Sequence, residues 1–501
     1  MNLTLLLDMA ASGFDDRVAF GPRTGGLTYA DLQTRANTGA ALLRDLDVEH
    51  LVYVATNGPE FPVALFAAAR AEIPLVPINY RLGREQLHEL LDHHPSSLVV
   101  VEDEVRDLVG EVGAKRVSPA EWMELTDLAH AGDPGPEPFD PEAIALLLYT
   151  SGTTAAPKAA VLRHRHLTSY VMTTVEFAGA DPDAASLVSV PPYHIAGVSN
   201  TVSNLYAGRR VVHLTSFTPQ TWLETVRAEG ITHALVVPTM LARVVEFLDE
   251  IGVDDAAVPT LRSLAYGGAP MPARIIERAL HLLPTTDFVN AYGLTETSST
   301  VAVLGPDDHR VAVYSDDPAV KARLGSAGQL VPGIEAEIRD ELGDPVAPGE
   351  VGELYLRGEQ VSGEYVGRDA ATDGDGWFPT RDRAWIDADG FLFIEGRADD
   401  TIIRGGENIA PAEIEEVLRG HAGIADVAVF GLPDEEWGQV IAAVVVTRPD
   451  HDVDADAVRA YAREHLRSSK TPDVVEFRAE LPVTETGKLL RRVLQADLTR
   501  G

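Results

Sequence analysis

The stretch LLLYTSGTTAAPKAAVL, residues 146–162, joins an apolar segment to a loop of small and hydroxylated residues. The apolar run predicts a strand, and Lys158 follows shortly after the loop. Small residues and hydroxyls after a strand can direct N–H and O–H donors at phosphate oxygens, and a lysine adds positive charge. These residues alone leave two interpretations open, a phosphate-binding loop and an ordinary surface loop. The loop consists of Thr150, Ser151, Gly152, Thr153 and Thr154.

On both sides of this stretch, helical and extended patterns alternate along the chain. Alternation of this kind predicts parallel sheets covered by helices. The expected helices are TYADLQTRANTGAALLRDL (28–46), PEFPVALFAAARAE (59–72) and REQLHELLDHH (84–94). The expected strands are LVYVAT (51–56), IPLVPIN (73–79), SLVVVED (97–103), VVHLT (211–215) and THALVVP (232–238).

The pattern changes twice toward the C-terminus. Residues 325–400 contain short strands separated by Gly and Asp turns, which predicts a small antiparallel unit. From about residue 400, a compact α+β pattern runs to the end. Residues 131–142 read as a loop that crosses between lobes. The expected fold is a large α/β N-terminal domain, with layered sheets, flanking helices and a small β unit, followed by a smaller mobile α+β domain.

The charge balance excludes some classes of partner. Of 501 residues, 41 are Lys or Arg and 77 are Asp or Glu, which gives a net charge of −36. A nucleic-acid partner or an anionic membrane surface requires clustered basic side chains, so we expect neither. The absence of cysteine rules out disulfides, thiolate metal sites and cysteine nucleophiles.

The N-terminus and the histidines support two further expectations. The first 16 residues contain no basic side chain, and no apolar run approaches about 20 residues, so we expect a soluble cytoplasmic protein. The pairs His93–His94 and His164–His166 lack a third metal ligand at useful spacing. We therefore expect these four histidines at the surface.

Six further segments, together with the loop, resemble the adenylate-forming (ANL) superfamily of acyl-CoA synthetases over essentially the whole chain. The family loop is usually written [ST]-S-G-T-T-G-x-P-K-G, and residues 150–159 read TSGTTAAPKA. The other segments follow in the family's order: PPYHIAG (191–197), YGGAP (266–270), NAYGLTET (290–297), TRDRAWIDADG (380–390), GRADDTIIRGGENIAPAEIE (396–415) and LPVTETGKLLR (481–491).

The resemblance implies an acyl-CoA ligase that uses ATP, Mg²⁺ and CoA. A carboxylate attacks the α-phosphate of ATP to give acyl-AMP and pyrophosphate, and a thiol then displaces AMP. Both halves build negative charge on oxygen, which Mg²⁺ and fixed donors would stabilise. The domains would be residues 1–398, which bind nucleotide and acyl group, and residues 399–501, which move about a hinge at Asp399.

The resemblance also assigns roles to individual residues. Glu296 would bind Mg²⁺, Thr295 the α-phosphate, and Tyr292 would stack on adenine. Asp382 would accept hydrogen bonds from both ribose hydroxyls, with Arg397 nearby. The remaining expected nucleotide contacts are Asn290 and Gly293, the loop residues 150–154 with Lys158, and Gly268, Ala269 and Pro270 against adenine.

Four more residues would act on the acyl and thiol side. His194 would lie between the acyl pocket and the CoA tunnel. Lys488 would hold the carboxylate and α-phosphate in one conformation and leave in the other. Gly405 and Gly406 would allow pantetheine to approach the backbone closely.

Three departures from the family pattern lie beside the expected phosphates and ribose. Ala155 and Ala159 replace loop glycines, and Arg381 replaces the glycine before Asp382. Where φ is positive, a side chain costs about 1 kcal/mol or more, and Arg381 would add bulk and charge beside the nucleotide. One hypothesis is a full two-step ligase. The other is an enzyme restricted to thioesterification of a ready-made acyl-adenylate, supplied by a partner adenylating enzyme.

Two alternatives remain beside these hypotheses. The first is an adenylation enzyme that loads a carrier protein in trans, and the second is a nucleotide-binding relic that only senses acyl-AMP. The expected acyl lining, which includes PPYHIAGVSNTVSN (191–204), is small and apolar and offers no basic residue for a second carboxylate. It therefore predicts a sizeable hydrophobic acid, linear or polycyclic.

Overall fold

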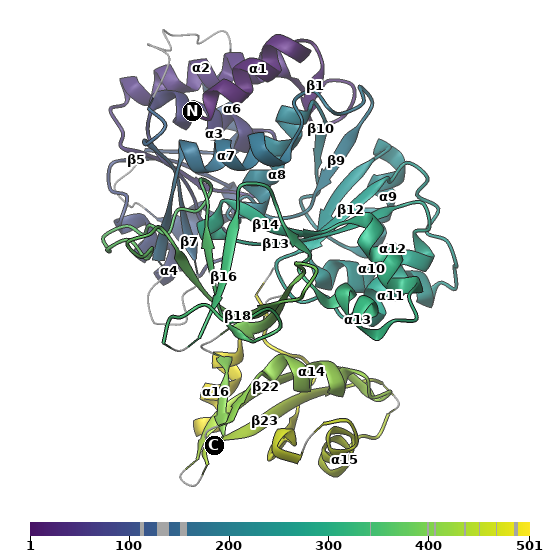
Figure 1. Cartoon of the computed structure of the whole chain (residues 1–501). Coiled ribbons are helices and arrows are strands. Elements are labelled where there is room, and N and C mark those ends of the chain that lie inside the picture. The colour runs from purple at the N-terminus through teal and green to yellow at the C-terminus, as the bar shows by residue number, and fades with distance from the viewer. Residues whose placement is uncertain are drawn as a thin grey trace.

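The computed structural model shows a large N-terminal domain and a small C-terminal domain (Figure 1), which confirms the expected fold class. It describes residues 1–110, 115–127, 140–150, 158–340, 342–397, 400–404, 407–434, 437–449, 451–466, 468–484 and 489–500.

The first sheet of the large domain has six strands in the order β6-β5-β3-β4-β7-β8. All neighbouring strands are parallel except β7 and β8, which pair antiparallel on either side of the glycine- and threonine-rich loop. Its strands are β3 (His50–Val54), β4 (Leu75–Pro77), β5 (Ser97–Val101), β6 (Lys115–Val117), β7 (Ile144–Thr150) and β8 (Lys158–Arg163). The helices of this region are α1 (Thr4–Phe14), α2 (Tyr29–Asp45), α3 (Glu60–Ala71), α4 (Arg84–Asp92), α5 (Asp103–Val109), α6 (Pro119–Leu125) and α7 (His164–Thr174).

The second sheet has nine strands in the order β15-β14-β13-β12-β11-β9-β10-β1-β2, with parallel pairing from β13 to β1. Its strands are β1 (Val18–Phe20), β2 (Leu27–Thr28), β9 (Ala185–Val188), β10 (Arg210–His213), β11 (His233–Val236), β12 (Ser263–Gly267), β13 (Asp287–Leu294), β14 (Ser299–Leu304) and β15 (Gln329–Leu330). The helices are α8 (Ile195–Ala207), α9 (Pro219–Glu229), α10 (Pro238–Glu250), α11 (Ala273–Leu282), α12 (Pro306–Tyr314) and α13 (Pro318–Ala322), with 3-10 turns η2 (Thr295–Thr297) and η3 (Arg323–Gly325).

Four short strands form the small antiparallel unit that the sequence predicted. They are β16 (Glu335–Arg339), β17 (Gly352–Arg357), β18 (Phe378–Ile386) and β19 (Leu392–Arg397), paired in chain order. This sheet packs its apolar face, including Leu354 and Leu356, against Val301 and Ala302 of β14. It therefore brings Asp382 of β18 close to the end of β13.

The C-terminal domain has its own apolar core, which includes Ile414, Val427 and Val445. Helix α14 lies on the side of this domain that faces the large domain (Figure 1) and contacts β19. The elements are β20 (Ile402–Arg404), β21 (Glu407–Ile409), α14 (Pro411–Arg419), β22 (Ile424–Asp434), β23 (Gly438–Thr447), α15 (Ala455–His465), η5 (Ser468–Lys470), β24 (Val474–Phe477) and α16 (Arg491–Arg500). The proposed boundary at residues 398–399 lies outside the described residues.

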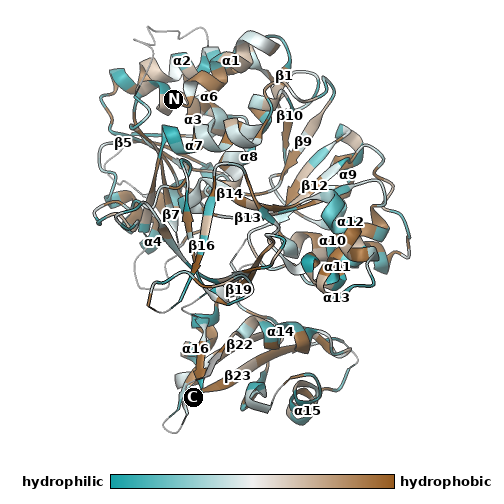
Figure 2. Cartoon of the chain, in the orientation of Figure 1, coloured by the Kyte–Doolittle hydropathy of each residue, from teal (hydrophilic) through white to brown (hydrophobic). Residues whose placement is uncertain are grey.

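Local sequence signals explain where several of these elements begin. Thr28 caps α2 by accepting a hydrogen bond from the backbone N–H of Asp31, whose carboxylate accepts one from Thr28 in return. Helix α2 then buries Leu32, Ala36, Ala40 and Leu43 at intervals of about one helical turn. Figure 2 shows a similar separation of apolar and polar residues across the molecule: the inner strands are largely hydrophobic, and hydrophilic residues lie on the outer helices.

The expectation of surface histidines is wrong for three of the four residues. His94, His164 and His166 are buried, and only His93 is exposed. The Nδ1 atoms of His164 and His166 accept hydrogen bonds from the backbone N–H groups of Leu3 and Arg163. Burial lowers the pKa of His164 to about 4 and that of His166 to about 3, so both rings stay neutral near pH 7.

Among the described residues, every helix is too short or too polar to cross a membrane.

Candidate functional site

The expected nucleotide motifs gather where β12 and β13 end side by side. The two strands are parallel, and Tyr266 and Gly267 lie opposite Asn290 and Ala291. The YGGAP and NAYGLTET segments therefore leave the sheet at the same carboxyl edge, where ligands of open α/β sheets bind. The turn η2, which carries Thr295 and Glu296, contacts β8 of the other sheet. This contact brings the Lys158 end of the phosphate-loop candidate to the same place.

One cluster at this edge is built around the carboxylate of Asp382. The Tyr292 hydroxyl donates to Asp382 Oδ2 at 2.5 Å, and Arg397 Nη1 donates to Asp382 Oδ1 at 3.0 Å. The Arg397 guanidinium also donates to the carbonyl of Thr380. Asp382 is only 4% exposed, and burial together with this carboxylate raises the pKa of Tyr292, which keeps its hydroxyl a donor. The predicted ribose and adenine residues are therefore in direct contact with one another.

A second cluster joins Glu296 to Lys158 through Tyr365. The Tyr365 hydroxyl donates to Glu296 Oε1 at 2.7 Å, and Lys158 Nζ lies 5.8 Å from the centre of the Tyr365 ring. Burial and the Glu296 carboxylate raise the pKa of Tyr365, so the phenol remains protonated. Glu296 Oε2 has no hydrogen-bond partner among the described residues. A carboxylate oxygen in this position fits Mg²⁺, which prefers oxygen ligands.

Backbone pairing holds this second cluster in place. Residues 362–366 run along the edge of β8: Val161 N donates to the carbonyl of Glu364, and Val366 N donates to that of Ala159. On the other side, Ser362 N donates to the carbonyl of Glu296 at 2.8 Å. The segment thus connects β8 to η2.

His194 begins the helix that borders the expected acyl pocket. It is the N-cap residue of α8, is partly buried, and packs its ring 4.6 Å from that of Tyr193. Burial lowers the pKa of His194 to about 4, so the imidazole is neutral near pH 7. The hydroxyl of Ser199 on α8 lies 2.9 Å from that of Ser299 on β14, which ties this helix to the strand that follows Glu296.

The structure also describes six other residues that the sequence predicts to contact the nucleotide. Asn290 uses its amide to donate to the Ser326 carbonyl, and Thr150 uses its hydroxyl to donate to the Lys158 carbonyl. Gly293 cannot carry a side chain, because a Cβ would lie 1.8 Å from the Ser299 carbonyl oxygen. Gly268 has a φ of +86°. It is followed by Ala269, which is half-buried, and Pro270, which is exposed.

Several expected residues lie outside the described part of the chain. They are Ser151, Gly152, Thr153, Thr154, Ala155, Asp399, Gly405, Gly406 and Lys488.

The structure shows the backbone conformation and surroundings of two of the three residues that depart from the family pattern, Arg381 and Ala159. Arg381 has a φ of +63°, a conformation that glycine adopts readily and other residues rarely do. Its side chain is 60% exposed and lies 3.7 Å from Glu353, so the expected crowding beside Asp382 is not observed. Ala159 lies in β8 opposite Tyr149 and takes no positive φ, so a glycine is not required there.

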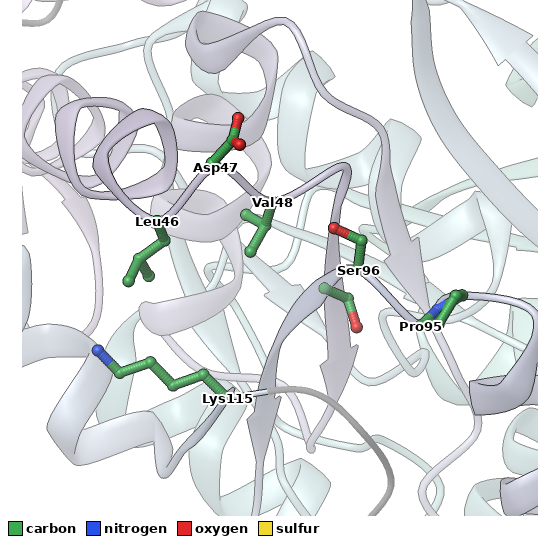
Figure 3. Close-up of a pocket in the computed structure, with 7 residues that line it drawn as sticks. Leu46, Asp47, Val48, Pro95, Ser96 and Lys115 are labelled. Atoms are coloured by element: carbon green, nitrogen blue, oxygen red, sulfur yellow. The ribbon is translucent and has the colours of Figure 1, made fainter.

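A cavity of about 430 Å³ lies elsewhere, at the amino ends of β3, β5 and β6 (Figure 3). Ligands of open α/β sheets bind at the opposite, carboxyl ends, and none of the expected site residues lines this cavity. We therefore do not assign it to the site. Its lining residues are Leu46, Asp47, Val48, Pro95, Ser96, Ser97 and Lys115.

We predict that Asp382→Asn destabilises the protein by about 1–3 kcal/mol, because an amide offers one acceptor where Tyr292 and Arg397 both donate. Urea-induced unfolding followed by circular dichroism measures the change. Asp183→Asn is the matched control, since its ion pair with Arg23 is exposed, and it should change stability by less than about 0.5 kcal/mol. Equal stabilities of the two variants would contradict the role given to Asp382.

We also predict that His194 contributes to a loss of stability in acid. Its folded pKa of about 4 lies below the ordinary value of 6.5, so the unfolded chain binds the proton more readily. The free energy of unfolding should therefore fall as the pH drops from 6.5 toward 4. In His194→Gln this fall should be smaller by on the order of 1 kcal/mol, whereas the exposed-site control His281→Gln should follow the wild type. Urea titrations across this pH range would contradict the account if the two variants behave alike.

Comparison with known proteins identifies the family. Residues 7–366 match the model of the AMP-binding enzyme family, and residues 413–488 match that of the AMP-binding enzyme C-terminal domain. A feruloyl-CoA synthase from Amycolatopsis sp is 35% identical, with 94% of each chain covered. The fatty acid–[acyl-carrier-protein] ligase ScoC from Streptomyces coeruleorubidus is 33% identical, with 94% of this chain and 91% of the relative covered.

A solved structure shares the same architecture. The o-succinylbenzoate CoA synthetase from Bacillus subtilis, in complex with its acyl-adenylate intermediate, superposes with a TM-score of 0.85 at 26% identity. The superposition covers 98% of this chain and 97% of that chain. Sequence motifs, fold and relatives agree, and the chain belongs to the AMP-binding enzyme family, within the adenylate-forming superfamily of acyl-CoA synthetases.

Proposed function

We propose that this enzyme joins a hydrophobic carboxylic acid to CoA through an acyl-adenylate, with ATP and Mg²⁺ as co-substrate and cofactor. The observation that carries the proposal is the meeting of two clusters at the carboxyl edge of β13, one around Asp382 and one around Glu296. The first offers a buried carboxylate, and the second offers a cation beside a carboxylate with one open oxygen. The names of the relatives, a feruloyl-CoA synthase among them, support the reaction class.

In the proposed site, this chain's residues bind and orient the nucleotide. Asp382 would accept both ribose hydroxyls, while Tyr292 and Arg397 hold its carboxylate in a fixed orientation. Mg²⁺, when bound by Glu296, would neutralise charge on the phosphates. Lys158 and Thr295 would face the phosphates from either side. The adenine would lie along Gly268, Ala269 and Pro270.

His194 would mark the border between the acyl pocket and the thiol's path. Its imidazole is neutral near pH 7 and can therefore accept or donate a single hydrogen bond. A neutral side chain also avoids binding a second carboxylate on the substrate. This supports a hydrophobic acid, as does the apolar start of α8 at Ile195 and Ala196.

We propose further that Lys488 and the glycine pair Gly405–Gly406 act in alternate conformations about Asp399. Lys488 would hold the acid and α-phosphate during adenylation, and the glycines would line the thiol's approach. Two of the chain's five lysines, Lys158 and Lys488, would then serve the same reaction.

A second candidate function is thioesterification alone, with acyl-AMP supplied by a partner adenylating enzyme. The strained backbone of Arg381 and the alanine at position 155 favour it. Against it, Ala159 is unstrained and the Arg381 side chain lies away from Asp382. Loading of a carrier protein in place of CoA is the other alternative, because ScoC is named as an acyl-carrier-protein ligase.

The test offers a panel of aromatic, linear and polycyclic acids with ATP, Mg²⁺ and CoA, and separately the matching acyl-adenylates with CoA alone. We expect acyl-CoA, AMP and pyrophosphate from the first set and acyl-CoA and AMP from the second, with mass spectrometry as the readout. Because Asp382 would hold the ribose of both ATP and acyl-AMP, Asp382→Asn should reduce turnover in both sets by about 100-fold or more.

The outcomes separate the candidates. Acyl-CoA from the adenylates but not from the acids would favour thioesterification alone, and Ala155→Gly or Arg381→Gly should then restore some pyrophosphate release. Acyl transfer only to a carrier protein would favour the third candidate. No thioester in either set would contradict the proposed function and leave a protein that only binds acyl-AMP.

A further inference from the structure

We propose that Tyr365 is a positioning residue that fixes Glu296 and Lys158 relative to each other. Mg²⁺ and the phosphates of ATP would then bind to a carboxylate and an ammonium group whose positions are already fixed. The inference rests on the proposed function, because it concerns the same site. Tyr365 stands in none of the motifs that carry the family resemblance, and its sequence neighbourhood, SGEYVGR (362–368), marks no chemistry by itself.

The hydroxyl of Tyr365 restrains Glu296. It donates to Oε1 at 2.7 Å and leaves Oε2 without a hydrogen-bond partner in the part of the chain that the structure describes. A carboxylate that is hydrogen-bonded through one oxygen presents the other in a defined direction. Outer hydrogen-bond partners of this kind orient ligating carboxylates and typically account for 10- to 100-fold in metal affinity.

The ring of Tyr365 restrains Lys158. The ammonium Nζ lies 5.8 Å from the ring centre, within the range of a cation–π contact. Lysine is long and flexible, so a ring that attracts its charged end limits the positions it samples. A single side chain, that of Tyr365, thus restrains both the Lys158 ammonium and the Glu296 carboxylate.

The backbone of Tyr365 is held as firmly as its side chain. Tyr365 bridges to Ala160 of β8, and its neighbour Val366 donates to the carbonyl of Ala159. Ser362, three residues earlier, donates to the carbonyl of Glu296. Tyr365 is therefore fixed to both β8 and η2, the two elements whose side chains it orients.

The role explains why a tyrosine stands here. Phenylalanine would keep the ring beside Lys158 but lose the donor to Glu296, and leucine would lose both. The two functions can therefore be separated by two substitutions. Tyr314 on α12 supplies a matched control, because this residue is 78% exposed.

The experiment measures ATP binding by isothermal titration calorimetry at a series of Mg²⁺ concentrations, in the full chain. We expect Tyr365→Phe to raise the Mg²⁺ concentration needed for half-maximal ATP affinity by about 10-fold or more, with little change in affinity at saturating Mg²⁺. Tyr365→Leu should weaken ATP binding several-fold even at saturating Mg²⁺, because Lys158 is also released. Tyr314→Phe should match the wild type, and thermal unfolding should show all variants folded.

Two results would overturn the inference separately from the proposed function. A Tyr365→Phe variant with the wild-type Mg²⁺ requirement would remove the role of the hydroxyl, whatever its thermal stability. A Tyr365→Leu variant that binds ATP like Tyr365→Phe would remove the role of the ring. A wild-type protein without Mg²⁺-dependent ATP binding would instead overturn ATP-dependent adenylation, and the role of Tyr365 with it.

Discussion

The pairing of residues 362–366 with the edge of β8 is the constraint on which the candidate site depends. Strand β8 belongs to the six-stranded sheet, and η2 follows β13 of the nine-stranded sheet. The segment 362–366 bonds to both, through Ala159 and Val161 on one side and Glu296 on the other. Lys158 and Glu296 belong to elements of separate sheets that contact each other, and this segment is hydrogen-bonded to both elements. The backbone hydrogen bonds of residues 362–366 thus help to set the distance between the Lys158 ammonium and the Glu296 carboxylate.

The proposed function requires a strongly acidic chain to bind polyanionic ligands at this site. A net charge of −36 opposes the approach of phosphates in general. Among the described residues, the candidate site offers positive charge at Lys158 and Arg397, and each cation contacts a group that restrains its position. Arg397 is paired with the buried Asp382. In the proposed function, the large domain would therefore present a hydrogen-bonding surface for the ribose beside a cationic surface for the phosphates. Binding of the nucleotide would then depend on the fixed positions of these side chains more than on the net charge of the chain.

Much of the fold could be predicted because its signals are local. The alternation of strand and helix before residue 110 and the short antiparallel strands after residue 325 both appear where expected. A family glycine can mark either a positive φ or a close backbone approach, so its replacement does not by itself predict the positive φ that the structure shows at Arg381. The direction of the Arg381 side chain is not predictable from the sequence either, because it depends on Glu353 on a neighbouring strand.

Contacts between distant residues could not be predicted in this way. Tyr365 was missed because its partner Glu296 lies 69 positions away and no local pattern marks it. His164 is expected at the surface because no sequence signal shows that the N-terminal residue Leu3 donates a hydrogen bond to its Nδ1 atom. In each case the decisive partner comes from tertiary packing, which composition and periodicity do not encode.

The most direct test of the account is the exchange of labelled pyrophosphate into ATP by the wild-type protein with Mg²⁺ and an accepted acid, without CoA. Exchange occurs only if the site forms an acyl-adenylate reversibly from ATP. The account predicts acid-dependent exchange that is abolished when the acid or Mg²⁺ is omitted. Absence of exchange with an acid whose adenylate the protein converts to acyl-CoA would contradict it.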